Sequence, residues 1–546
     1  MPMTSESQVL VRSLVFIGGG HAHVHALKMI GMKPIPGVQV TLITRDVDTP
    51  YSGMLPGHIA GHYTKEECHI DLRKMARFAD VVLVHTEAVG LDIEKRLVHC
   101  KDGRPPIPYD VLSIDIGSTP KFVESRNPMD LKRVTRVKPI DSFSARWDSI
   151  VRRVLGESQQ QQHPPTAAVG QGSPSLLTNG SSQVKVVVVG GGAGGVELAL
   201  AMQYRLKQLF REARRDPDMV AVEIVNRGEV LLSSHNRRVQ KAFKRVLSDR
   251  KVGVHTSKEV VDVRDPPEGV PFGGTGSLVC SDGTEIPFSE AIWCTNSGAA
   301  TWLLDTGLAL NEQGFIEVND FLESTSTPGV FAVGDCAHMV NHPRPKAGVF
   351  AVRQGPPLAE NLRRMLEGRA MRGFKPQKAF LGLISTGDEN AVLSWRGLAW
   401  ESSRLWTFKD YIDRKWMKKY KELPLMDGPG KDSSSGPLPP PPPRAVAAAG
   451  PAAVEAVRNA TMRCGGCGSK VGAGVLGRVL SRLNVAGDRG FGGLDDAAVV
   501  VPPSEPGAVM VHTVDFFRSF VSDPFVFGQI AANPRCRTST PWGRSL

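Results

Sequence analysis

The sequence VKVVVVGGGAGGVELA at residues 184–199 decides the fold of this chain. Five valines in six residues form a buried-strand pattern, and the glycines that follow fit the spacing GxGxxG at Gly190, Gly192 and Gly195. In such a strand–turn–helix unit the first glycine permits a tight turn and the second lets a pyrophosphate approach the backbone. The third lets the helix pack closely on the strand, and the helix N-terminus faces the anion. The stretch predicts a dinucleotide-binding domain.

An earlier copy of this pattern lies near the N-terminus, where the apolar run 14–17 is followed by GGGHAH at residues 18–23. Gly18 and Gly20 fit the spacing, but His23 stands where the third glycine belongs, so the helix must pack on its strand differently. A glycine turn that binds no ligand is the alternative for either copy. The repetition predicts an α/β fold with two Rossmann-like dinucleotide-binding domains.

The strand after each glycine turn should end near the ribose of the bound nucleotide, where an acidic residue is expected. The strand at 38–43 is followed by Asp46, which can serve the first copy. The strand at 220–225 ends in Asn226 and Arg227 instead. Since Arg227 could pair with a 2′-phosphate, both NADH and NADPH stay open as ligands.

Further motifs follow in a fixed order: YDVL before DIGSTP at 115–120, WCTNSG at 293–298, TPGVFAVGDCA at 327–337 and PKAGVFA at 345–351. Together with the two glycine turns they resemble the flavoproteins with two dinucleotide domains. The similarity is nearest to the type II NADH dehydrogenases and sulfide:quinone reductases, and it covers residues 13–426.

The resemblance implies FAD together with NADH or NADPH, in a split flavin domain. Residues 13–137 would form the first part of the FAD domain, and 184–320 the inserted NAD(P)H domain. Residues 321–375 would complete the FAD domain. Residues 376–426 would form a tail with a basic amphipathic helix.

The resemblance also implies site residues. Asp335 would contact the ribityl chain, Glu197 would orient the nicotinamide, and Lys346 lies in the segment along the isoalloxazine, so Glu197 and Lys346 are the catalytic candidates. An exposed helix residue is the alternative for Glu197. The cofactor-binding candidates are Gly18, Gly20, His21, Asp46, Pro56, Gly117, Gly190, Gly192, Gly195, Gly298, Gly334, Asp335 and Ala347.

Cysteine spacing limits the chemistry. Disulfide reductases of this superfamily carry two cysteines four residues apart, and no such pair occurs in residues 1–426. Hydride should therefore pass directly from nicotinamide to flavin, with Cys336 as a packed residue. The electrons would leave to a quinone or another small acceptor, a sulfur or selenium compound included.

Residues 404–421 (RLWTFKDYIDRKWMKKYK) place aromatic and aliphatic side chains among seven basic ones. This pattern is typical of an amphipathic helix that lies on an anionic membrane. Alternatively, the helix packs its aromatic residues on the flavin domain and leaves a solvated basic face. The sequence leaves both open.

Composition bounds the remaining possibilities. The 546 residues are 41% hydrophobic and 22% charged, with a net charge of +11, and no apolar run reaches membrane-spanning length. We read the charge as a solvated basic surface and expect no nucleic-acid partner. Six of the eight cysteines are scattered singly, and only Cys464 and Cys467 form a close pair. This usage and the lack of an apolar signal core favour a reducing, intracellular location, cytoplasmic or peripheral to a membrane. A homodimer is a further expectation.

Two segments interrupt the globular pattern. Residues 156–183 are rich in Gln, Ser and Gly, which predicts a flexible insert. Residues 427–460 contain a proline run followed by alanines, which predicts a semi-rigid linker.

After the linker, RCGGCGSK at 463–470 and the later carboxylates resemble the N-terminus of selenide, water dikinase. This resemblance makes residues 461–533 a truncated α+β fragment with Cys467 and Lys470 as its catalytic pair. Its metal ligands would be Asp495, Asp496 and Asp515. Mg²⁺ and ATP would bind only if the domain were complete.

Residues 534–546 leave that resemblance abruptly. One set of codons for Pro534–Gly543, read two nucleotides later, spells ALSDVYAMG, which is the continuation that the family shows. We therefore expect residues 534–546 to be a frameshifted tail. Resequencing the transcript tests this expectation.

Overall fold

The computed structural model describes residues 12–120, 131–138, 140, 143–155, 183–265, 275–295, 297–424, 497–500, 510–513, 521 and 523–530. It forms two compact units, residues 1–424 and 425–546. Several predictions lie outside the described residues: nearly all of the insert, the linker, Cys467, Lys470, Asp495, Asp496, Asp515 and the tail at 534–546.

The first sheet of unit 1 is parallel, and its order is β21-β9-β1-β2-β5. Its strands are β1 (Arg12–Ile17), β2 (Val38–Thr44), β5 (Val82–His85), β9 (Val111–Ile114) and β21 (Val330–Ala332). Strand β21 joins this sheet only after the chain has built a second sheet. The first domain is therefore split, as the motif order predicts.

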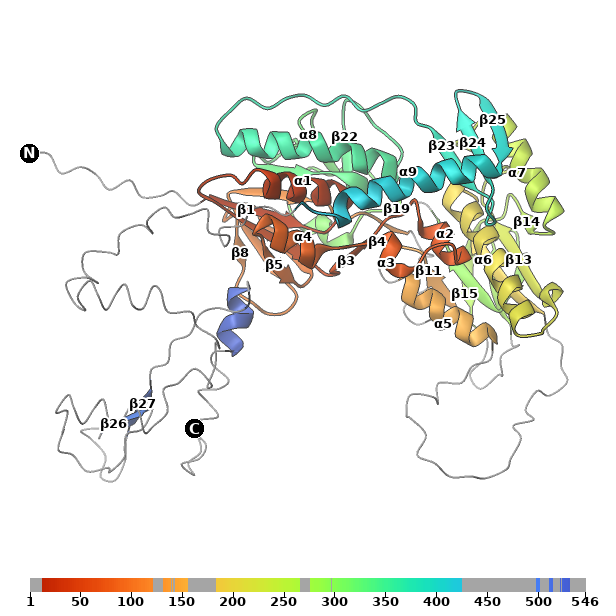
Figure 1. The fold of residues 1–546 in the computed structure, drawn as a ribbon, viewed down its shortest axis with the longest axis horizontal. Helices are drawn as coiled ribbons and strands as arrows, with labels where there is room; N and C mark the ends of the chain where they lie inside the picture. Colours follow the sequence, from red (N-terminus) through yellow and green to blue (C-terminus); the bar gives the residue numbers. More distant parts are fainter. Residues whose placement is uncertain are drawn as a thin grey trace, which may run out of the picture. The chain divides into compact units, whose positions relative to one another are not determined.

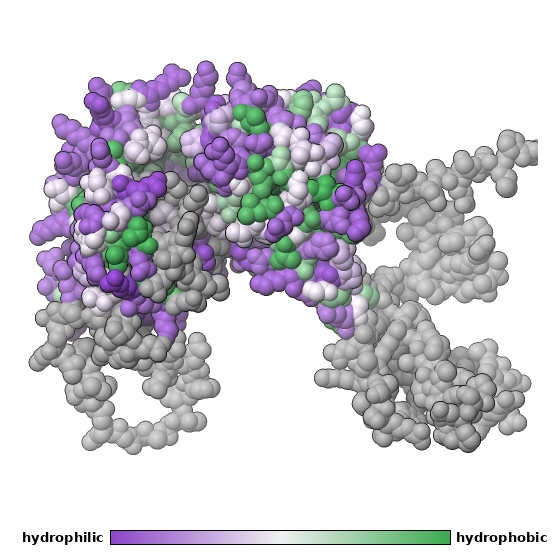
Figure 2. All heavy atoms as spheres, turned by 180° about the vertical axis from the view of Figure 1, so that it is seen from behind, coloured by the Kyte–Doolittle hydropathy of each residue, from purple (hydrophilic) through white to green (hydrophobic). Residues whose placement is uncertain are grey.

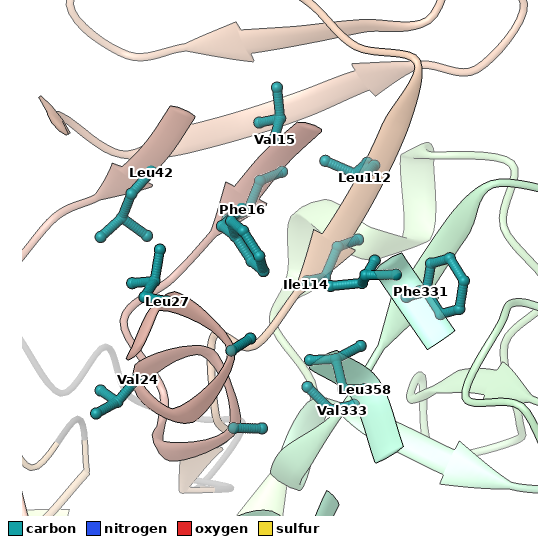
Figure 3. Packing of buried hydrophobic residues seen from close by; sticks show 14 of the residues in the cluster. Val15, Phe16, Val24, Leu27, Leu42, Leu112, Ile114, Phe331, Val333 and Leu358 are labelled. Atoms are coloured by element: carbon teal, nitrogen blue, oxygen red, sulfur yellow. The ribbon is translucent and has the colours of Figure 1, made fainter. Parts of the chain in front are cut away.

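Two long helices cover one face of the first sheet, α1 (His21–Met32) and α8 (Gly348–Leu366). Figure 3 shows Phe16 of β1 on the same side of the sheet as Leu27 of α1 and Leu358 of α8, whereas Val15 and Leu112 point to the opposite side. All five side chains are fully buried. Their burial fixes the start of α1 directly beneath the carboxyl end of β1.

The second sheet is also parallel, with the order β11-β18-β12-β13-β14. Its strands are β11 (Val134–Arg136), β12 (Val184–Val189), β13 (Val220–Val225), β14 (Gly253–His255) and β18 (Glu290–Trp293). The structure thus shows the α/β fold with two Rossmann-like domains. Strand β11 belongs to this sheet because Val134 packs in its core, so the chain changes sheets before the predicted limit at residue 137.

The valines of β12 alternate between two cores, as a strand's period of two requires. Val186 and Val188 pack with the helices α5 (Phe143–Leu155), α6 (Ala193–Glu212) and α7 (Arg237–Asp249). Val187 and Val189 pack with a small antiparallel sheet on the other face. That sheet consists of β15 (Val260–Arg264), β16 (Gly276–Cys280) and β17 (Glu285–Phe288).

The tail of unit 1 forms a three-stranded antiparallel sheet and a long helix. The strands are β23 (Gly382–Ser385), β24 (Ala391–Trp395) and β25 (Leu398–Ser402), and α9 (Ser403–Lys421) follows. The Ser402 hydroxyl caps α9 by accepting a hydrogen bond from Arg404 N–H. Helix α9 contacts α1 and α3 as well as β23–β25, so it bridges the parts of unit 1 (Figure 1).

The other elements of unit 1 connect these layers. They are β3 (Asp48–Pro50), α2 (Leu55–Ala60), α3 (Lys65–Cys68), β4 (His69–Asp71), α4 (Leu72–Ala79), β6 (Ala88–Asp92), β7 (Leu97–Cys100), β8 (Ile107–Pro108), β10 (Thr119–Pro120), η3 (Pro217–Met219), β19 (Ser297–Gly298), η4 (Thr301–Asp305), β20 (Ile316–Val318), η5 (Gly334–Cys336) and β22 (Ala337–Met339).

Within unit 2, β26 (Ala497–Val500) pairs antiparallel with β27 (Met510–Thr513), and residues 524–530 are helical. Figure 2 shows the face opposite to that of Figure 1, where apolar residues form small separate groups among hydrophilic ones. None of the helices in the described ranges has the length and apolar character needed to cross a membrane.

Candidate dinucleotide and redox site

The first glycine turn is tight because the backbone of the β9 end lies against it. Gly18 has φ +91°, and a Cβ there would overlap the Asp115 carbonyl. The Gly20 amide donates to the same carbonyl oxygen at 3.2 Å. Only glycine fits at Gly18, so the turn that the sequence predicts is present.

The N-terminus of α1 is capped by a distant carboxyl group. Gly20 is the N-cap residue and has no side chain, but Asp115 Oδ2 accepts hydrogen bonds from Ala22 N–H (3.0 Å) and His23 N–H (3.2 Å). Asp115 is only 3% exposed. Burial raises its pKa to about 7 against the lowering effect of the two amides, and the nearby Asp335 raises it as well.

His23 replaces the third glycine with a buried, hydrogen-bonded ring. Its Nδ1 donates to the Gly18 carbonyl at 2.7 Å, so Nε2 accepts from the Ser113 hydroxyl at 2.8 Å. Burial lowers the pKa of His23 to about 3, so the ring is neutral. The helix is therefore held on β9 through an imidazole rather than by direct backbone contact.

His21 is the residue of the first turn with unused hydrogen-bonding groups. Its ring lies edge-on to Tyr51 and Trp416, with centroid distances of 5.5 and 5.1 Å. Nδ1 is buried without a partner, and among the described residues no acceptor lies within reach of its backbone N–H. Burial lowers the pKa of His21 to about 4. Buried polar groups of this kind fit a bound cofactor.

The late motif meets the end of β9, as its position in the sequence predicts. Asp335 accepts hydrogen bonds from the Ser118 hydroxyl at 3.0 Å and from Lys138 Nζ at 2.9 Å. Gly117, just before Ser118, has φ +69° and open space where a Cβ would be. These groups leave room for a ligand beside the carboxyl end of the strand.

A small pocket opens next to Asp335, lined among others by Lys346, Ala347 and His338. Lys346 Nζ donates to the Ala337 carbonyl and lies 3.9 Å from the centroid of the Phe315 ring. Burial lowers the pKa of Lys346. Ala347 is the N-cap residue of α8. Both predicted residues therefore line one cavity.

The second glycine turn follows the standard packing at each of its glycines. Gly190 has φ +123°, and a Cβ there would overlap the Cys294 carbonyl. A Cβ on Gly195 would overlap the Gly190 carbonyl, so the helix rests directly on the turn. Gly192 has nothing within 4 Å of its Cβ position, which leaves the approach open for a phosphate.

Glu197 lies on the first turns of α6 and is half-buried. Its Oε1 accepts a hydrogen bond from Ser385 N–H at 2.7 Å. Burial raises its pKa to about 7, opposed by the positive charge of Lys409 and the Ser385 amide. The alternative of an exposed helix residue is therefore wrong.

Sequence reasoning missed Lys409 and Asp413, which form an ion pair of 2.5 Å on α9 with side chains 12% and 7% exposed. Lys409 also donates to the Gly53 carbonyl at 2.6 Å. Burial raises the pKa of Tyr51, and the negative charge of Asp413 and a hydrogen bond to it raise it further. Opposite charges four residues apart on the apolar side of the helix were the signal available in the sequence.

Helix α9 packs part of its aromatic residues on the first domain, which was one of the two alternatives for this segment. Trp416 stacks on Tyr51 with ring centroids 4.3 Å apart, and the Tyr420 hydroxyl lies 3.0 Å from His25 Nδ1. These aromatic residues pack on the flavin-type domain. On the outer side, Phe408 and Tyr411 are about half exposed.

The remaining predicted residues lie where the two domains meet or at their outer ends. Thr119 of β10 pairs with Gly298 of β19, which joins the carboxyl ends of β9 and β18. Pro56 is buried in α2. Asp46 forms an ion pair with Arg45 at 2.8 Å and is half-buried.

The end of β13 carries Asn226 and Arg227 in place of an acid. Asn226 Oδ1 accepts from Gly191 N–H at 3.2 Å, and its amide donates to the carbonyls of Gly228 and Val230. It therefore holds the turn together. The Arg227 side chain is 71% exposed, 3.4 Å from Glu259.

Thiol and metal chemistry have little support in the part of the chain that the structure describes. Its five cysteines are free, and no group of three His, Cys, Asp or Glu side chains there is arranged to hold a metal ion. Cys336 is buried and donates to the Val333 carbonyl at 3.1 Å. Burial raises its pKa to about 12, as expected for a packed residue.

The chain has two Rossmann-like domains. The first is split around the second, and the carboxyl ends of their strands meet. This arrangement defines the class of oxidoreductases that bind two dinucleotides. The unpaired His21 ring nitrogen and the open space at Gly117 and Gly192 fit FAD and a nicotinamide nucleotide. This chain belongs to the pyridine nucleotide-disulphide oxidoreductase family, whose model matches residues 12–355. It is an FAD-dependent NAD(P)H oxidoreductase.

Known proteins match different parts of the chain. It is 22% identical to a NADH dehydrogenase-like protein of Bacillus subtilis over 390 residues, 69% of this chain and 90% of that protein. Its fold is similar to that of the sulfide:quinone oxidoreductase of Aquifex aeolicus, with a TM-score of 0.57, 15% identity, and coverage of 75% of this chain and 91% of that one.

A third similarity is local. The chain is 49% identical to the selenide, water dikinase of Desulfitobacterium hafniense over 72 residues, 12% of this chain. It spans about a fifth (21%) of the length of that relative.

Proposed function

We propose that this oxidoreductase takes electrons from NADH or NADPH and passes them to a quinone. The observation that carries the proposal is the junction of the two domains: the β10–β19 pair brings together the strand ends that carry Gly117 and Gly298. The sites for flavin and nicotinamide would then adjoin. FAD, when bound, would supply the two-electron chemistry that couples a hydride donor to the acceptor.

In this proposal Glu197 orients the nicotinamide from the start of α6. Its pKa near 7 allows either protonation state at neutral pH. The Ser385 amide holds the carboxyl group in place, and the charges of the Lys409–Asp413 pair act on its pKa from α9. Since these partners lie on the tail of unit 1, the tail contributes to the site and is more than a surface appendage.

A quinone is favoured by the surroundings of α9. The helix packs its inner aromatic residues beside His21 and Tyr51, while Phe408 and Tyr411 face outward among basic residues. A surface of this composition fits the headgroup region of an anionic membrane, where a quinone would be available. The likeness to a sulfide:quinone oxidoreductase is consistent with this acceptor but shows the fold alone.

A sulfur or selenium acceptor is the second candidate, and the local match to selenide, water dikinase favours it. If the C-terminal region is complete in the full gene product, ATP-dependent selenophosphate synthesis would be a separate activity of the same protein. Its predicted residues Cys467, Lys470, Asp495, Asp496 and Asp515 lie outside the described residues.

The first experiment is the visible spectrum of the purified full chain before and after anaerobic addition of NADH, then of NADPH. We expect flavin bands that bleach with at least one nucleotide. Glu197→Gln keeps the acceptor for Ser385 N–H and should slow bleaching about tenfold to a hundredfold. Bands that persist with both nucleotides contradict the proposed electron donor, and a chain that cannot bind FAD contradicts the whole proposal.

The second experiment identifies the acceptor. The NAD(P)H-reduced chain is mixed with a short-chain ubiquinone, with polysulfide or with selenite, and return of the flavin bands is followed. Fast reoxidation by the quinone alone supports the first candidate. Fast reoxidation by polysulfide or selenite alone replaces it with the second.

A further inference from the structure

One buried carboxyl group lies where three motifs of the flavin-type domain converge. A Cβ on Gly20 would overlap the Asp115 carboxyl group, and a Cβ on Gly334 would lie 2.5 Å from its Oδ1. Gly20 belongs to the first glycine turn, Gly334 to the late motif, and Asp115 to the end of β9. In the proposed function all three segments face the phosphates and ribityl chain of FAD.

Asp115 also uses two of the backbone N–H groups at the start of α1 that could otherwise bind an anion. The amides of Ala22 and His23 donate to its Oδ2, whereas the His21 amide has no acceptor among the described residues. The positive end of α1 is thus shared between the protein's own carboxyl group and any phosphate that binds there.

The groups that face Asp115 do not neutralise it. From α1 it is faced by His21 and His23, both neutral because burial lowers their pKa. From η5 it is faced by Asp335 and Cys336. No ion pair in the described ranges includes Asp115.

The two nearby cations have other partners. Lys138 is paired with Asp335, and Lys346 donates to the Ala337 carbonyl. Asp115 would therefore meet an incoming anion without a counter-ion of its own.

A carboxylate and a pyrophosphate in one buried site repel each other strongly, because little water screens them. Protonation removes the repulsion and leaves Oδ2 free to accept from both amides. We infer that binding of FAD to this chain is coupled to the uptake of one proton by Asp115, so that FAD affinity falls as pH rises. This inference rests on the proposed function, because it needs FAD in the first glycine turn.

The direction of the pH dependence follows from the linkage between FAD binding and protonation of Asp115. The carboxyl group of the ligand-free chain has a pKa of about 7, and the added negative charge of FAD raises it further. Below pH 7 both states hold the proton, and the affinity is constant. Above pH 7 the ligand-free chain has lost the proton that the complex retains. The dissociation constant then increases about tenfold per pH unit.

The test titrates the full-length apoprotein with FAD, by quenching of flavin fluorescence, at pH 6, 7, 8 and 9. Calorimetry at pH 8 in two buffers with different ionisation enthalpies counts the protons taken up. We expect one proton and a roughly hundredfold weaker affinity at pH 9 than at pH 7. Asp115→Asn keeps an oxygen for the two amides, and its affinity should be independent of pH.

Asp335→Asn is the second variant. It removes the other carboxylate near the site, whose charge raises the pKa of Asp115, so the pH dependence should begin at lower pH and keep its one-proton slope. A flat pH dependence in the wild type, or an undiminished slope in Asp115→Asn, overturns the inference while leaving FAD binding intact. Absence of FAD binding at pH 6 overturns the inference and the proposed function together. The calorimetric proton count needs only the wild type, so it decides the question even if a variant fails to fold.

Discussion

The two glycine turns reach the same backbone shape with opposite packing. In the second turn, Gly195 lets α6 rest directly on the Gly190 carbonyl. In the first, His23 holds α1 at a distance, with one ring nitrogen on the Gly18 carbonyl and the other on Ser113. A strand, a turn and a helix can therefore be assembled either by removing a side chain or by adding one whose hydrogen bonds are all satisfied.

The turns also differ in their charge. The second leaves Gly192 open and has no carboxylate against its helix amides among the described residues, whereas Asp115 caps the first. The second turn is thus ready for a phosphate. In our inference, the first turn binds a phosphate only when Asp115 is protonated. The following predictions test this contrast.

The largest effect is expected from Gly195→Ala, because its Cβ would overlap backbone that cannot move without opening the turn. We expect a loss of about 3 kcal/mol or more in the free energy of unfolding. Gly192→Ala is the matched control, since its Cβ meets nothing. It should lower the free energy of unfolding by under about 1 kcal/mol and raise the KM for NAD(P)H instead. Denaturant unfolding of both variants checks this, and equal stabilities would contradict it.

His23→Gly restores the glycine of the fingerprint, yet the structure predicts destabilisation. The change removes a buried ring and leaves the Ser113 hydroxyl without its partner. We expect a loss of about 3 kcal/mol in the free energy of unfolding. Ser113→Ala should cost about 1 kcal/mol. Thermal unfolding measures both, and a variant His23→Gly as stable as the wild type would show that the ring is dispensable.

The cost of His23→Gly should depend on pH. The pKa of His23 is about 3 in the folded chain and 6.5 when unfolded, so the unfolded state takes up a proton that the folded state refuses. The stabilisation that the neutral His23 ring gives the folded state is therefore complete above pH 6.5 and is lost as pH falls. The stability difference between wild type and variant should shrink by up to about 1.4 kcal/mol per unit between pH 6.5 and 4. Urea midpoints at several pH values measure it, and a constant difference would contradict it.

The smallest effect concerns nucleotide choice at the second turn. Arg227 is exposed at the end of β13, where it could pair with a 2′-phosphate. Arg227→Ala should raise the KM for NADPH about tenfold and leave the KM for NADH nearly unchanged. Asn226→Ala removes a support of the turn and should affect both nucleotides alike. The KM for each nucleotide is measured by flavin bleaching. An equal increase in both KM values with Arg227→Ala would exclude a role of Arg227 in nucleotide selectivity.

The glycine turns and the order of motifs were enough to predict the two domains and the region of the site. Positions such as Gly117, Gly334 and Asp335 could be chosen because the motifs that contain them resemble those of the flavoprotein family. Asp115 lies in the same quoted motif but was not chosen, because its role depends on α1 coming within 3.2 Å of it. The partners of Glu197 were missed for the same reason: Lys409 is more than two hundred residues away.

The sequence by itself determined what is local: valine runs that form strands, glycines that alone adopt the turns, and a basic helix with an apolar side. These properties need only the residue and its immediate neighbours. Only the tertiary structure decided that β11 joins the second sheet, that His23 finds Ser113, that Asp115 caps α1 and that α9 packs on Tyr51. Each of those depends on burial and hydrogen bonding between segments far apart in the chain, for which local spacing carries no signal.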